Sequence, residues 1–387
     1  MIDVHLGHIW ARTAMAEVET LPHSLRLAVP VMKPAALAAA KDLFSSRGDG
    51  FRVFLDETCG MPSNWAETWR TWNSSGPRLS AGISKYVADS YILHLLENSP
   101  FVVSDWRRAN VSVVALISRA YGGANLAAER CRRKMARESA AWRATGGARH
   151  VFILTSDRGP CCNSGQLMNL GLLQHHIAGH HGELAGHHWR TGTAPDIGCF
   201  HSFKDISIPT PNFVQPPPPS TVPAARDVLA FYAGGGLGAA SGTPTPGLRE
   251  GRRRLLEKWG NRTNHPDIVV MPYSSRSMYK ATMAAAKYCP IMGGFAPWTP
   301  RLNEAVFAGC VPVIFSSLLP PFSRVLDWSQ FTVRVGSLHE IGRLREILEQ
   351  QDHAKLSSKL AMVRHALWFR LEGSYSGDDM LPFFILE

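Results

Sequence analysis

The stretch Met292–Ile314, which reads MGGFAPWTPRLNEAVFAGCVPVI, carries the pattern that decides the fold class. The apolar run Lys287–Met292 leads into it and indicates a strand, and Gly293 and Gly294 directly afterwards indicate a tight turn. Glycine at such a turn allows the backbone to approach a ligand closely. The pattern therefore begins as a strand that ends in a loop suited to ligand contact.

A helix and a second strand follow this turn. Thr299 is a suitable N-cap, and Pro300 suits the first helical position, where its missing N–H leaves nothing unsatisfied. Gly309 suits the C-terminus of the helix, and Val311–Phe315 indicates a buried strand. This order of elements is typical of a nucleotide-binding unit, in which the N-terminus of the helix holds phosphate.

Two polar side chains near the start of that helix are candidate ligands for a nucleotide. Arg301 and Glu304 lie about one turn apart and share a face of the helix. A guanidinium can clamp a diphosphate, and a carboxylate can accept hydrogen bonds from a ribose diol. We interpret both as nucleotide ligands together with Gly293 and Gly294. The alternative interpretation is an ordinary surface ion pair.

The composition indicates a globular protein with anionic partners. The 387 residues are 45% hydrophobic and 19% charged, which suits two domains that each bury a core. The formal net charge of +10 favours nucleotide phosphates and acidic glycans as ligands. The basic runs Arg130–Arg137 and Arg249–Arg254 lack interleaved aromatic residues, so we expect no nucleic-acid partner.

The decisive stretch and further motifs, which keep their order along the chain, resemble the exostosin-like glycosyltransferases (glycosyltransferase family 47). The motifs that carry the resemblance are Trp142-x3-Gly146-Gly147-x2-His150-Val151-Phe152, Lys204-Asp205-Ile206-x-Ile208-Pro209, Arg226–Leu229, Phe231-x-Ala233-Gly234, Lys287–Ile314, Leu319–Phe322 and Leu326–Trp328. The resemblance implies an α/β fold with GT-B-type architecture, in which two doubly wound Rossmann-like domains face a cleft and the second binds the nucleotide-sugar donor.

Composition and resemblance together predict how the chain divides. We expect a poorly defined N-terminal segment (1–45), an acceptor-side Rossmann-like domain (46–215), a Pro-rich linker (216–224), a nucleotide-sugar-binding domain (225–345) and a C-terminal helical segment that packs back on the domains (346–387). His150–Thr155 is apolar enough to be a central strand, and residues 158–220 are predicted to be irregular. Leu338–Gln350 and Ala354–Arg370 are predicted to be helices.

The sequence offers few residues for the chemistry of sugar transfer. It contains no Asp-x-Asp triplet to hold a divalent ion against a diphosphate, so we expect no metal and no other cofactor. Arg301, the N-terminus of its helix and Arg252 are then the candidates that stabilise the leaving diphosphate. For Arg252 the resemblance is to the family's Arg-x-x-Leu, and Arg249, Arg253 and Arg254 compete for that assignment.

The resemblance also supplies a candidate general base. Asp157 follows a predicted strand and matches the Asp of the family's His-Asp-x-Gly motif, although it could instead cap the next loop. The family's His is replaced by Ser156, and the family's Asp before His150 is replaced by Arg149. Both replacements are expected to face the cleft, where they bear on activity and acceptor choice.

The resemblance implies an inverting transferase that moves a sugar from a UDP-sugar to a polysaccharide or glycoprotein glycan acceptor. The alternatives are a non-catalytic member of the same fold and a nicotinamide dehydrogenase. A dehydrogenase would place a helix after its glycine loop, whereas Gly234-Gly235-Gly236-x-Gly238 runs into a Pro-rich segment. The donor sugar, the acceptor and the linkage are not readable from the sequence.

Several other patterns allow two interpretations. The six histidines within 175–188 suggest a metal site if His176 and His180 share a helix, but their glycines favour a solvated loop. Trp65, Trp69 and Trp72 lie on one helical face, either as core or as a glycan-stacking surface. The seven cysteines show no pairing pattern, and Cys289 and Cys310 fit a strand core as well as a disulfide.

The location of the protein is predicted from the resemblance alone. Family members usually act in the Golgi lumen or at its membrane, and three glycosylation sequons permit a luminal chain, at Asn73, Asn110 and Asn261. No run of about 18 apolar residues indicates a transmembrane segment. The resemblance also allows homo- or hetero-oligomers with related transferases.

Overall fold

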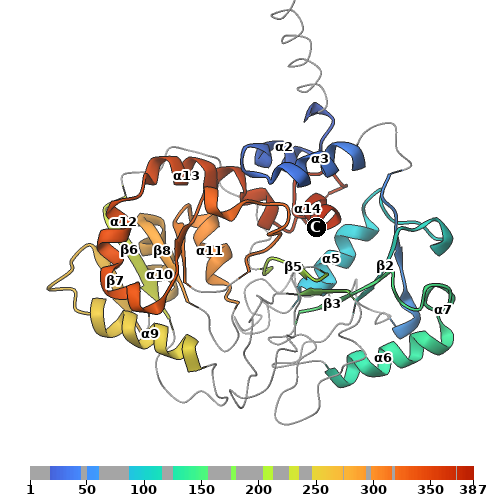
Figure 1. The fold of residues 1–387 in the computed structure, drawn as a ribbon, viewed down its shortest axis with the longest axis horizontal. Coiled ribbons are helices and arrows are strands. Elements are labelled where there is room, and N and C mark those ends of the chain that lie inside the picture. The colour runs from blue at the N-terminus through green and yellow to red at the C-terminus, as the bar shows by residue number, and fades with distance from the viewer. Residues whose placement is uncertain are drawn as a thin grey trace, which may run out of the picture.

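The computed structural model contains two five-stranded sheets, which lie side by side (Figure 1). Every strand pairing in both sheets is parallel. The structure describes residues 18–44, 50–60, 87–115, 125–155, 176–179, 204–211, 226–234, 246–272, 274–292, 298–315, 319–371 and 373–387. Parallel sheets with helices between their strands confirm the predicted α/β class.

The decisive stretch contributes to the second sheet. Its strands are β6 (Val228–Ala233), β7 (Ile268–Met271), β8 (Ala286–Ile291), β9 (Val311–Phe315) and β10 (Val333–Val335). They lie in the order β10-β9-β8-β6-β7. The chain therefore winds outward from β6 to β7 and then crosses back to β8, so the winding direction reverses between β6 and β8. Such a reversal is the usual ligand position in a doubly wound sheet.

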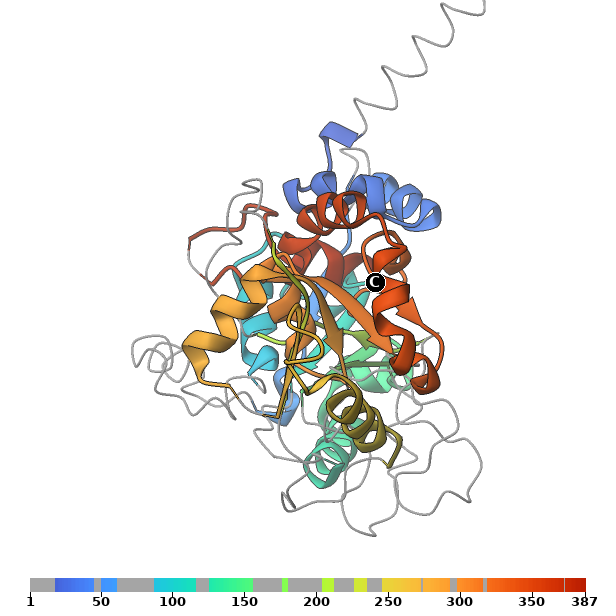
Figure 2. The ribbon, with the colours of Figure 1, turned by 90° about the vertical axis from the view of Figure 1, so that its left-hand side faces the viewer.

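Helices cover both faces of this sheet. They are α9 (Pro246–Trp259), α10 (Arg276–Ala285), α11 (Arg301–Ala308) and α12 (Leu344–Glu349). The helix α10 packs on β6 and β8 and beside α11, whereas α9 packs on β7. Figure 2 shows α9 and α10 on different sides of the sheet. Gly309 ends α11 in the left-handed region with φ of 71°, as the sequence predicts.

The first sheet comprises β1 (Val53–Leu55), β2 (Val111–Ala115), β3 (His150–Leu154), β4 (His176–Gly179) and β5 (Ile206–Ser207), in that order. A further parallel bridge joins Val53 to Val102 on the outer side of β1. Val53 N donates to Phe101 O at 2.8 Å, and Val103 N donates to Val53 O at 2.9 Å. With this segment included, the winding direction reverses between β1 and β2.

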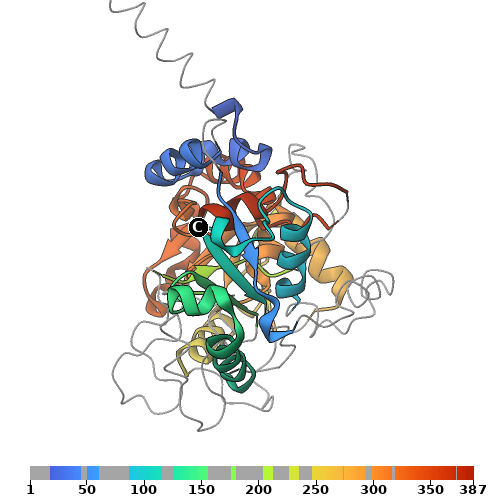
Figure 3. The ribbon, with the colours of Figure 1, turned by 90° about the vertical axis from the view of Figure 1, so that its right-hand side faces the viewer.

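The helices of the first sheet also lie on two sides. They are α5 (Ala88–Glu97), α6 (Asn125–Glu138) and α7 (Ala140–Thr145). Figure 3 shows β1 between α5 on one side and α6 and α7 on the other. Val113 and Ile153 join the core that contains α5, whereas Val114 and Phe152 pack with Trp142 of α7. The alternation along β2 and β3 therefore buries both faces, which agrees with the predicted central position of β3.

Helices from the two ends of the described chain pack together. They are α2 (His23–Ala28), α3 (Pro34–Leu43), α13 (His353–Met362) and α14 (Leu381–Leu386). The helix α14 contacts α2, α3 and α5, and Figure 1 shows these helices above both sheets. Short 3-10 turns complete the structure: η1 (Val29–Val31), η2 (Glu57–Cys59), η5 (Trp106–Arg108), η6 (Trp328–Gln330), η7 (Leu338–Arg343) and η8 (Arg364–Leu367).

Several boundaries differ from the sequence predictions. The prediction that 158–220 is irregular is wrong at β4 and β5, because pairing to β3 imposes a strand on short segments whose own pattern is weak. The predicted helix Ala354–Arg370 ends at Met362 and continues as η8. Leu338–Gln350 begins as the 3-10 turn η7, where Ser337 and Glu340 form a capping box. The domain boundaries themselves stay predictions.

Two disulfides connect neighbouring elements among the described residues. Cys59 bonds to Cys131 of α6, with Cα atoms 5.2 Å apart, and Cys289 of β8 bonds to Cys310, with Cα atoms 5.7 Å apart. Both separations lie in the usual range for disulfides. The second bond decides between the two interpretations that the sequence left open. Within the described part of the chain, no helix is long and apolar enough to cross a membrane.

We predict that both disulfides stabilise the fold. The Cys289–Cys310 bond closes a loop with a sequence separation of 21, and the Cys59–Cys131 bond one of 72. Replacing either pair by alanine should lower the free energy of unfolding by about 2–4 kcal/mol, as denaturant titration would measure. A reductant should lower the stability of the wild type. It should not change the stability of a variant that lacks both disulfides. A wild type insensitive to reductant would contradict the prediction.

We also predict that the buried carboxyl group of Asp379 makes the stability of the fold depend on pH. It is 4% exposed, and burial raises its pKa to about 7, although Leu381 N donates to its Oδ1 at 3.0 Å. The unfolded chain ionises this group near pH 4 and the folded chain only near pH 7, so stability falls as pH rises across that window. Asp379→Asn keeps the acceptor and should flatten this fall, by on the order of 1.4 kcal/mol per pKa unit. An unchanged pH slope in thermal unfolding would refute the assignment.

Candidate functional site

The candidate site lies at the carboxyl edge of the second sheet, where the winding direction reverses. β6 ends at Ala233 and β8 ends at Ile291, and these strands are neighbours in the sheet. Open α/β sheets bind ligands in the crevice outside such strand ends, because the connections there diverge to opposite faces. The first turn of α11 follows β8 and reaches this crevice.

Local hydrogen bonds start α11 at the expected place. Arg301 N donates to Thr299 Oγ1 at 3.4 Å, and Leu302 N donates to the Thr299 carbonyl at 3.2 Å. The N-cap position itself is Pro300, one residue later than the sequence predicts. A proline there has the backbone angle that a helix start requires and carries no N–H to satisfy.

The Arg301 side chain turns back from α11 onto the end of β6. Its Nη2 donates to the carbonyl oxygen of Ala233. Its guanidinium carbon lies 4.3 Å from the ring centroid of Tyr232 and 5.5 Å from that of Tyr279. Cation–π contact with two rings fixes the guanidinium plane. Its Nη1 is buried and has no hydrogen-bond partner. One fixed donor is therefore available for a ligand oxygen.

Gly234 makes room for this arrangement. A Cβ at this position would lie 2.4 Å from Tyr232 Oη and 3.1 Å from Arg301 Nη2. Tyr232 is 1% exposed, and its hydroxyl also has no hydrogen-bond partner. Unpaired buried polar groups are rare in native proteins and call for an explanation. Two of them beside one glycine, at a strand end, form a cradle for a ligand rich in acceptors.

Glu304 contacts the same crevice through Tyr279 of α10. The Tyr279 hydroxyl donates to Glu304 Oε2 at 2.6 Å. Burial raises the pKa of Tyr279, and the carboxylate of Glu304 raises it further against the opposing effect of Arg301. The tyrosine therefore stays a neutral donor at physiological pH. The structure brings Arg301 and Glu304 into one cluster, in which Arg301 donates to the Ala233 carbonyl and Glu304 accepts from Tyr279.

Arg252 lies on α9, beside Gly251. A Cβ on Gly251 would come within 3.3 Å of Met292 Sδ, which places this part of α9 near the carboxyl end of β8. Its neighbours Arg253 and Arg254 both donate to Glu250, so these two guanidinium groups are engaged on the helix itself. The assignment of Arg252 as a ligand of the nucleotide-sugar donor stays a prediction.

The remaining predicted site residues, Asp157, Gly293 and Gly294, lie outside the described residues. So do the three tryptophans and most of the histidine-rich stretch. His176 lies in β4, so the interpretation of this position as loop or helix is wrong. Among the residues that the structure describes, no group of three or more His, Cys, Asp or Glu side chains is placed to hold a metal ion.

His150, which belongs to one of the family motifs, has a structural role at the start of β3 in the first sheet. His150 starts β3, and its Nε2 lies 3.2 Å from Asp56 Oδ2. Burial favours the neutral form of Asp56, but hydrogen bonds from His150, Ser139 and Thr58 outweigh it and lower its pKa to about 2. Arg149 precedes β3 at the amino end of the strand, so the expectation that Arg149 faces the cleft is wrong. Ser156 lies outside the described residues, so its half of the expectation stays a prediction.

Sequence reasoning missed Tyr232 and Tyr279. Tyr232 lies in an apolar strand, where it is indistinguishable from a core residue. Tyr279 lies in α10, whose amphipathic pattern predicts only a packed helix. The available signal was position, because Tyr232 is the last but one residue of its strand and lies two residues before Gly234. Side chains at the carboxyl ends of parallel strands are the ones that reach ligands.

Comparison with known proteins identifies the family of the chain. The Exostosin GT47 domain matches residues 47–350. A protein of Arabidopsis thaliana named "Probable glycosyltransferase" is 33% identical over 199 residues, which are 44% of this chain and 36% of that protein. A second protein of that name and organism is 28% identical over 230 residues, which are 58% of this chain and 43% of its own length.

A rice relative, from Oryza sativa subsp. japonica, is named "Probable glucuronosyltransferase". It is 26% identical over 234 residues, which are 59% of this chain and 51% of the relative. The chain thus spans about a third to a half of the length of the relatives it matches. The family match covers both sheets and the whole cluster around Arg301. The chain belongs to the exostosin GT47 family of glycosyltransferases.

Proposed function

We propose that the chain is an inverting glycosyltransferase of GT-B architecture that transfers a sugar from a UDP-sugar to a glycan acceptor. The observation that carries the proposal is the Arg301 guanidinium, held between Tyr232 and Tyr279 at the switch point with a buried unpaired Nη1. Beside it the Tyr232 hydroxyl is unpaired as well. A diphosphate supplies the acceptor oxygens and the negative charge that this cluster lacks.

The same cluster accounts for departure of the nucleotide. When the bond between the sugar carbon and the diphosphate breaks, negative charge grows on the leaving oxygen. Arg301 Nη1 and the N-terminus of α11 stabilise that charge. Both are preorganised, because their positions are fixed before the reaction. Glu304, oriented by Tyr279, accepts hydrogen bonds from the ribose diol. Arg252 is proposed as a second cation toward the diphosphate.

Asp157 is proposed as the general base. It removes the proton from an acceptor hydroxyl while that oxygen attacks the anomeric carbon from the face opposite the diphosphate. One bond forms as the other breaks, and the diphosphate leaves with the electron pair, so the configuration inverts. The proposed mechanism uses no metal. In the sequence, Asp157 comes three residues after Leu154, the last residue of β3, and this order supports the proposal.

The disulfides favour a luminal compartment. Two pairs among the described residues, Cys59–Cys131 and Cys289–Cys310, persist in oxidising environments such as the secretory pathway. This supports the Golgi lumen as the site of action. The name of the rice relative makes glucuronic acid the first donor sugar to test. The non-catalytic alternative rests on Ser156, which stands where the family has a histidine.

We predict that UDP stabilises the purified chain without a divalent ion. Thermal unfolding in a panel of UDP, GDP and UDP-sugars should show an upward shift with UDP compounds that survives EDTA. Loss of the shift in EDTA would refute the metal-free mechanism. No shift with any nucleotide would refute the donor site. A shift with UDP but neither transfer nor hydrolysis of any UDP-sugar would favour the non-catalytic alternative.

Glu304 and Tyr279 allow a graded test of the donor site. Glu304→Ala should weaken UDP binding by more than threefold, roughly 0.65 kcal/mol, because it removes the proposed ribose ligand. Tyr279→Phe keeps the carboxylate and loses only the bond that orients it, so its effect should be smaller. Glu346→Ala, at an exposed position on α12, is the matched control and should bind UDP as the wild type does. Titration calorimetry measures all three. UDP affinity of Glu304→Ala within about threefold of the wild type would refute the assignment.

A further inference from the structure

The loop between α9 and β7 contains an N-glycosylation sequon that the proposed function does not use. The tripeptide is Asn261-Arg262-Thr263, and all three residues are exposed. N-glycosylation attaches a large polar glycan to an Asn side chain, so the acceptor has to lie on the surface. A second sequon, Asn110-Val111-Ser112, leads into β2, and the sequon at Asn73 lies outside the described residues. The structure therefore allows two of the three sequons to be compared.

The loop around Asn261 is fixed at its base and exposed at its tip. Trp259, the last residue of α9, is 3% exposed, and its Nε1 donates to Ile341 O at 2.8 Å. The centroid of the His265 ring lies 4.6 Å from that of the Trp259 ring, where the chain returns toward β7. Residues 260–264, between these two contacts, are all exposed. The sequon thus projects from a short loop whose ends are held in place by packing.

The side chain of Asn261 folds its own sequon into a turn. Thr263 N donates to Asn261 Oδ1 at 3.0 Å, which is the hydrogen bond of an Asx turn. This bond uses the carbonyl oxygen of the side chain, whereas a glycan would be attached to the amide nitrogen Nδ2. An Asn that carries a glycan still has its carbonyl oxygen, so the modified residue can keep the same turn.

The sequon at Asn110 is held in the first sheet instead. Asn110 Oδ1 accepts a hydrogen bond from Arg52 N at 2.7 Å, and Asn110 N donates to Arg52 O at 2.8 Å. Ser112 lies within β2 and is only 5% exposed. Because a sequon is defined by its first and third positions, an enzyme that recognises it has to reach both. The folded chain exposes both positions at Asn261 and Thr263, but buries the hydroxyl residue of the other sequon, Ser112.

The loop around Asn261 also lies away from the proposed donor site. It leads into the amino end of β7, which pairs in parallel with β6. The donor site lies at the carboxyl ends of β6 and β8, which form the opposite edge of the same sheet. Figure 1 shows β7, an edge strand, on the side of the second sheet that faces away from the first. A glycan on this loop would therefore project from the edge opposite the crevice.

We propose that Asn261, rather than Asn110, carries an N-linked glycan. An oligosaccharyltransferase of the cell supplies it from a lipid-linked oligosaccharide diphosphate. Asn261 Nδ2 forms a bond to the anomeric carbon and gives a proton to a base of that enzyme, while the lipid diphosphate leaves with the electron pair. The inference rests on the luminal location proposed above, which the two disulfides support, and does not depend on sugar transfer by the chain itself.

Substitutions within the sequon separate the modification from the fold. Asn261→Gln removes the acceptor, whereas Thr263→Ala removes the sequon but keeps Asn261 and the backbone N–H of its turn. Thr263→Ser keeps the sequon and is the matched control. Both positions are exposed, and surface substitutions usually change stability little. All three variants should therefore bind UDP as the wild type does.

The experiment reads the modification at each Asn separately. The full chain is isolated from the cells that produce it, unfolded, and treated with a peptide-N-glycosidase in heavy-oxygen water, which converts a glycosylated Asn into labelled Asp. After cleavage at glutamate, mass spectrometry measures the label on the peptide that begins at Lys258 and contains both Asn261 and Asn264. Asn264 belongs to no sequon and is the internal control for spontaneous deamidation. We expect label at Asn261 in most molecules, and little at Asn110 or Asn264.

The variants are produced in a eukaryotic host that secretes the chain behind an added signal peptide. Label at Asn261 should be lost in Thr263→Ala and retained in Thr263→Ser, and Asn261→Gln should lose the part of the intact mass that the glycan contributes. No label at Asn261, or equal label at Asn110, would overturn the proposal, because the folded structure would then not distinguish the two sequons.

The outcomes also separate this proposal from the others. If Asn73 or Asn110 is labelled and Asn261 is not, the luminal location stands and only the assignment of the site is wrong. No label at any of the three sequons contradicts the luminal location as well. Absent UDP binding, by contrast, refutes the proposed function and leaves the glycan assignment standing.

Discussion

The covalent bond between Cys289 and Cys310 is the constraint on which the rest of the candidate site depends. Cys289 lies in the middle of β8 and Cys310 directly precedes β9, and both are fully buried. The loop between them contains the whole of α11. The disulfide therefore fixes both ends of the segment that carries Arg301 and Glu304. A short closed loop limits the conformations this segment can adopt in the unfolded chain, so less entropy is lost when the helix N-terminus is positioned.

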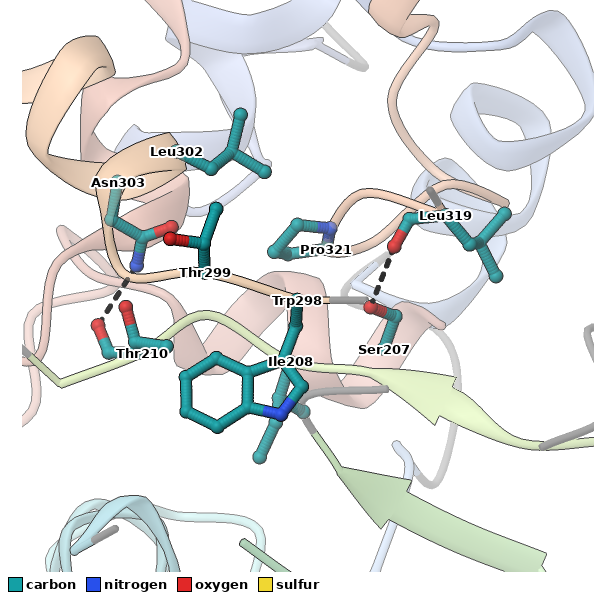
Figure 4. Close-up of a pocket in the computed structure, with 9 residues that line it drawn as sticks. All are labelled: Ser207, Ile208, Thr210, Trp298, Thr299, Leu302, Asn303, Leu319 and Pro321. Carbon is teal, nitrogen blue, oxygen red and sulfur yellow. Dashed lines mark hydrogen bonds between the residues drawn. The ribbon is translucent and has the colours of Figure 1, made fainter. Parts of the chain in front are cut away.

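The first turn of α11 connects two parts of the molecule with different tasks. On one side the Arg301 side chain donates a hydrogen bond to the carbonyl oxygen of Ala233, at the end of β6 in the second sheet. On the other side the Asn303 side chain donates a hydrogen bond to the carbonyl oxygen of Thr210, which follows β5 of the first sheet (Figure 4). A shift of this turn would therefore alter the proposed donor site and the contact with the first sheet together. Such coupling suits a transferase, because the leaving group and the attacking hydroxyl must be aligned across one sugar ring.

The sequence predicted the strands better than the site. The bounds of β7 and β9 follow from apolar runs between turn residues, and the end of α11 follows from Gly309, because these signals are local. The strand β4 could not be found, since it is held by pairing to β3 rather than by its own composition. The unpaired state of the Tyr232 hydroxyl and of Arg301 Nη1 is invisible in any sequence pattern. It depends on which groups the whole fold brings, or fails to bring, within bonding distance.

Buried polar groups without a hydrogen-bond partner also occur elsewhere in the structure. Their position in the fold must therefore show which of them belong to a ligand site. Ser24 and Tyr375 also have unpaired buried hydroxyls, and they lie among the helices that pack the two ends of the described chain. Tyr232 differs from them because it lies at the carboxyl end of a parallel strand, beside the switch point of the second sheet. Asp56 also lies at the carboxyl end of a strand, directly after β1, but its carboxylate is hydrogen-bonded to Ser139, His150 and Thr58 and serves stability. At the switch point of the second sheet, the unpaired Tyr232 hydroxyl lies close to a second unpaired group, Arg301 Nη1, and this pairing of unsatisfied groups is what supports the proposed donor site.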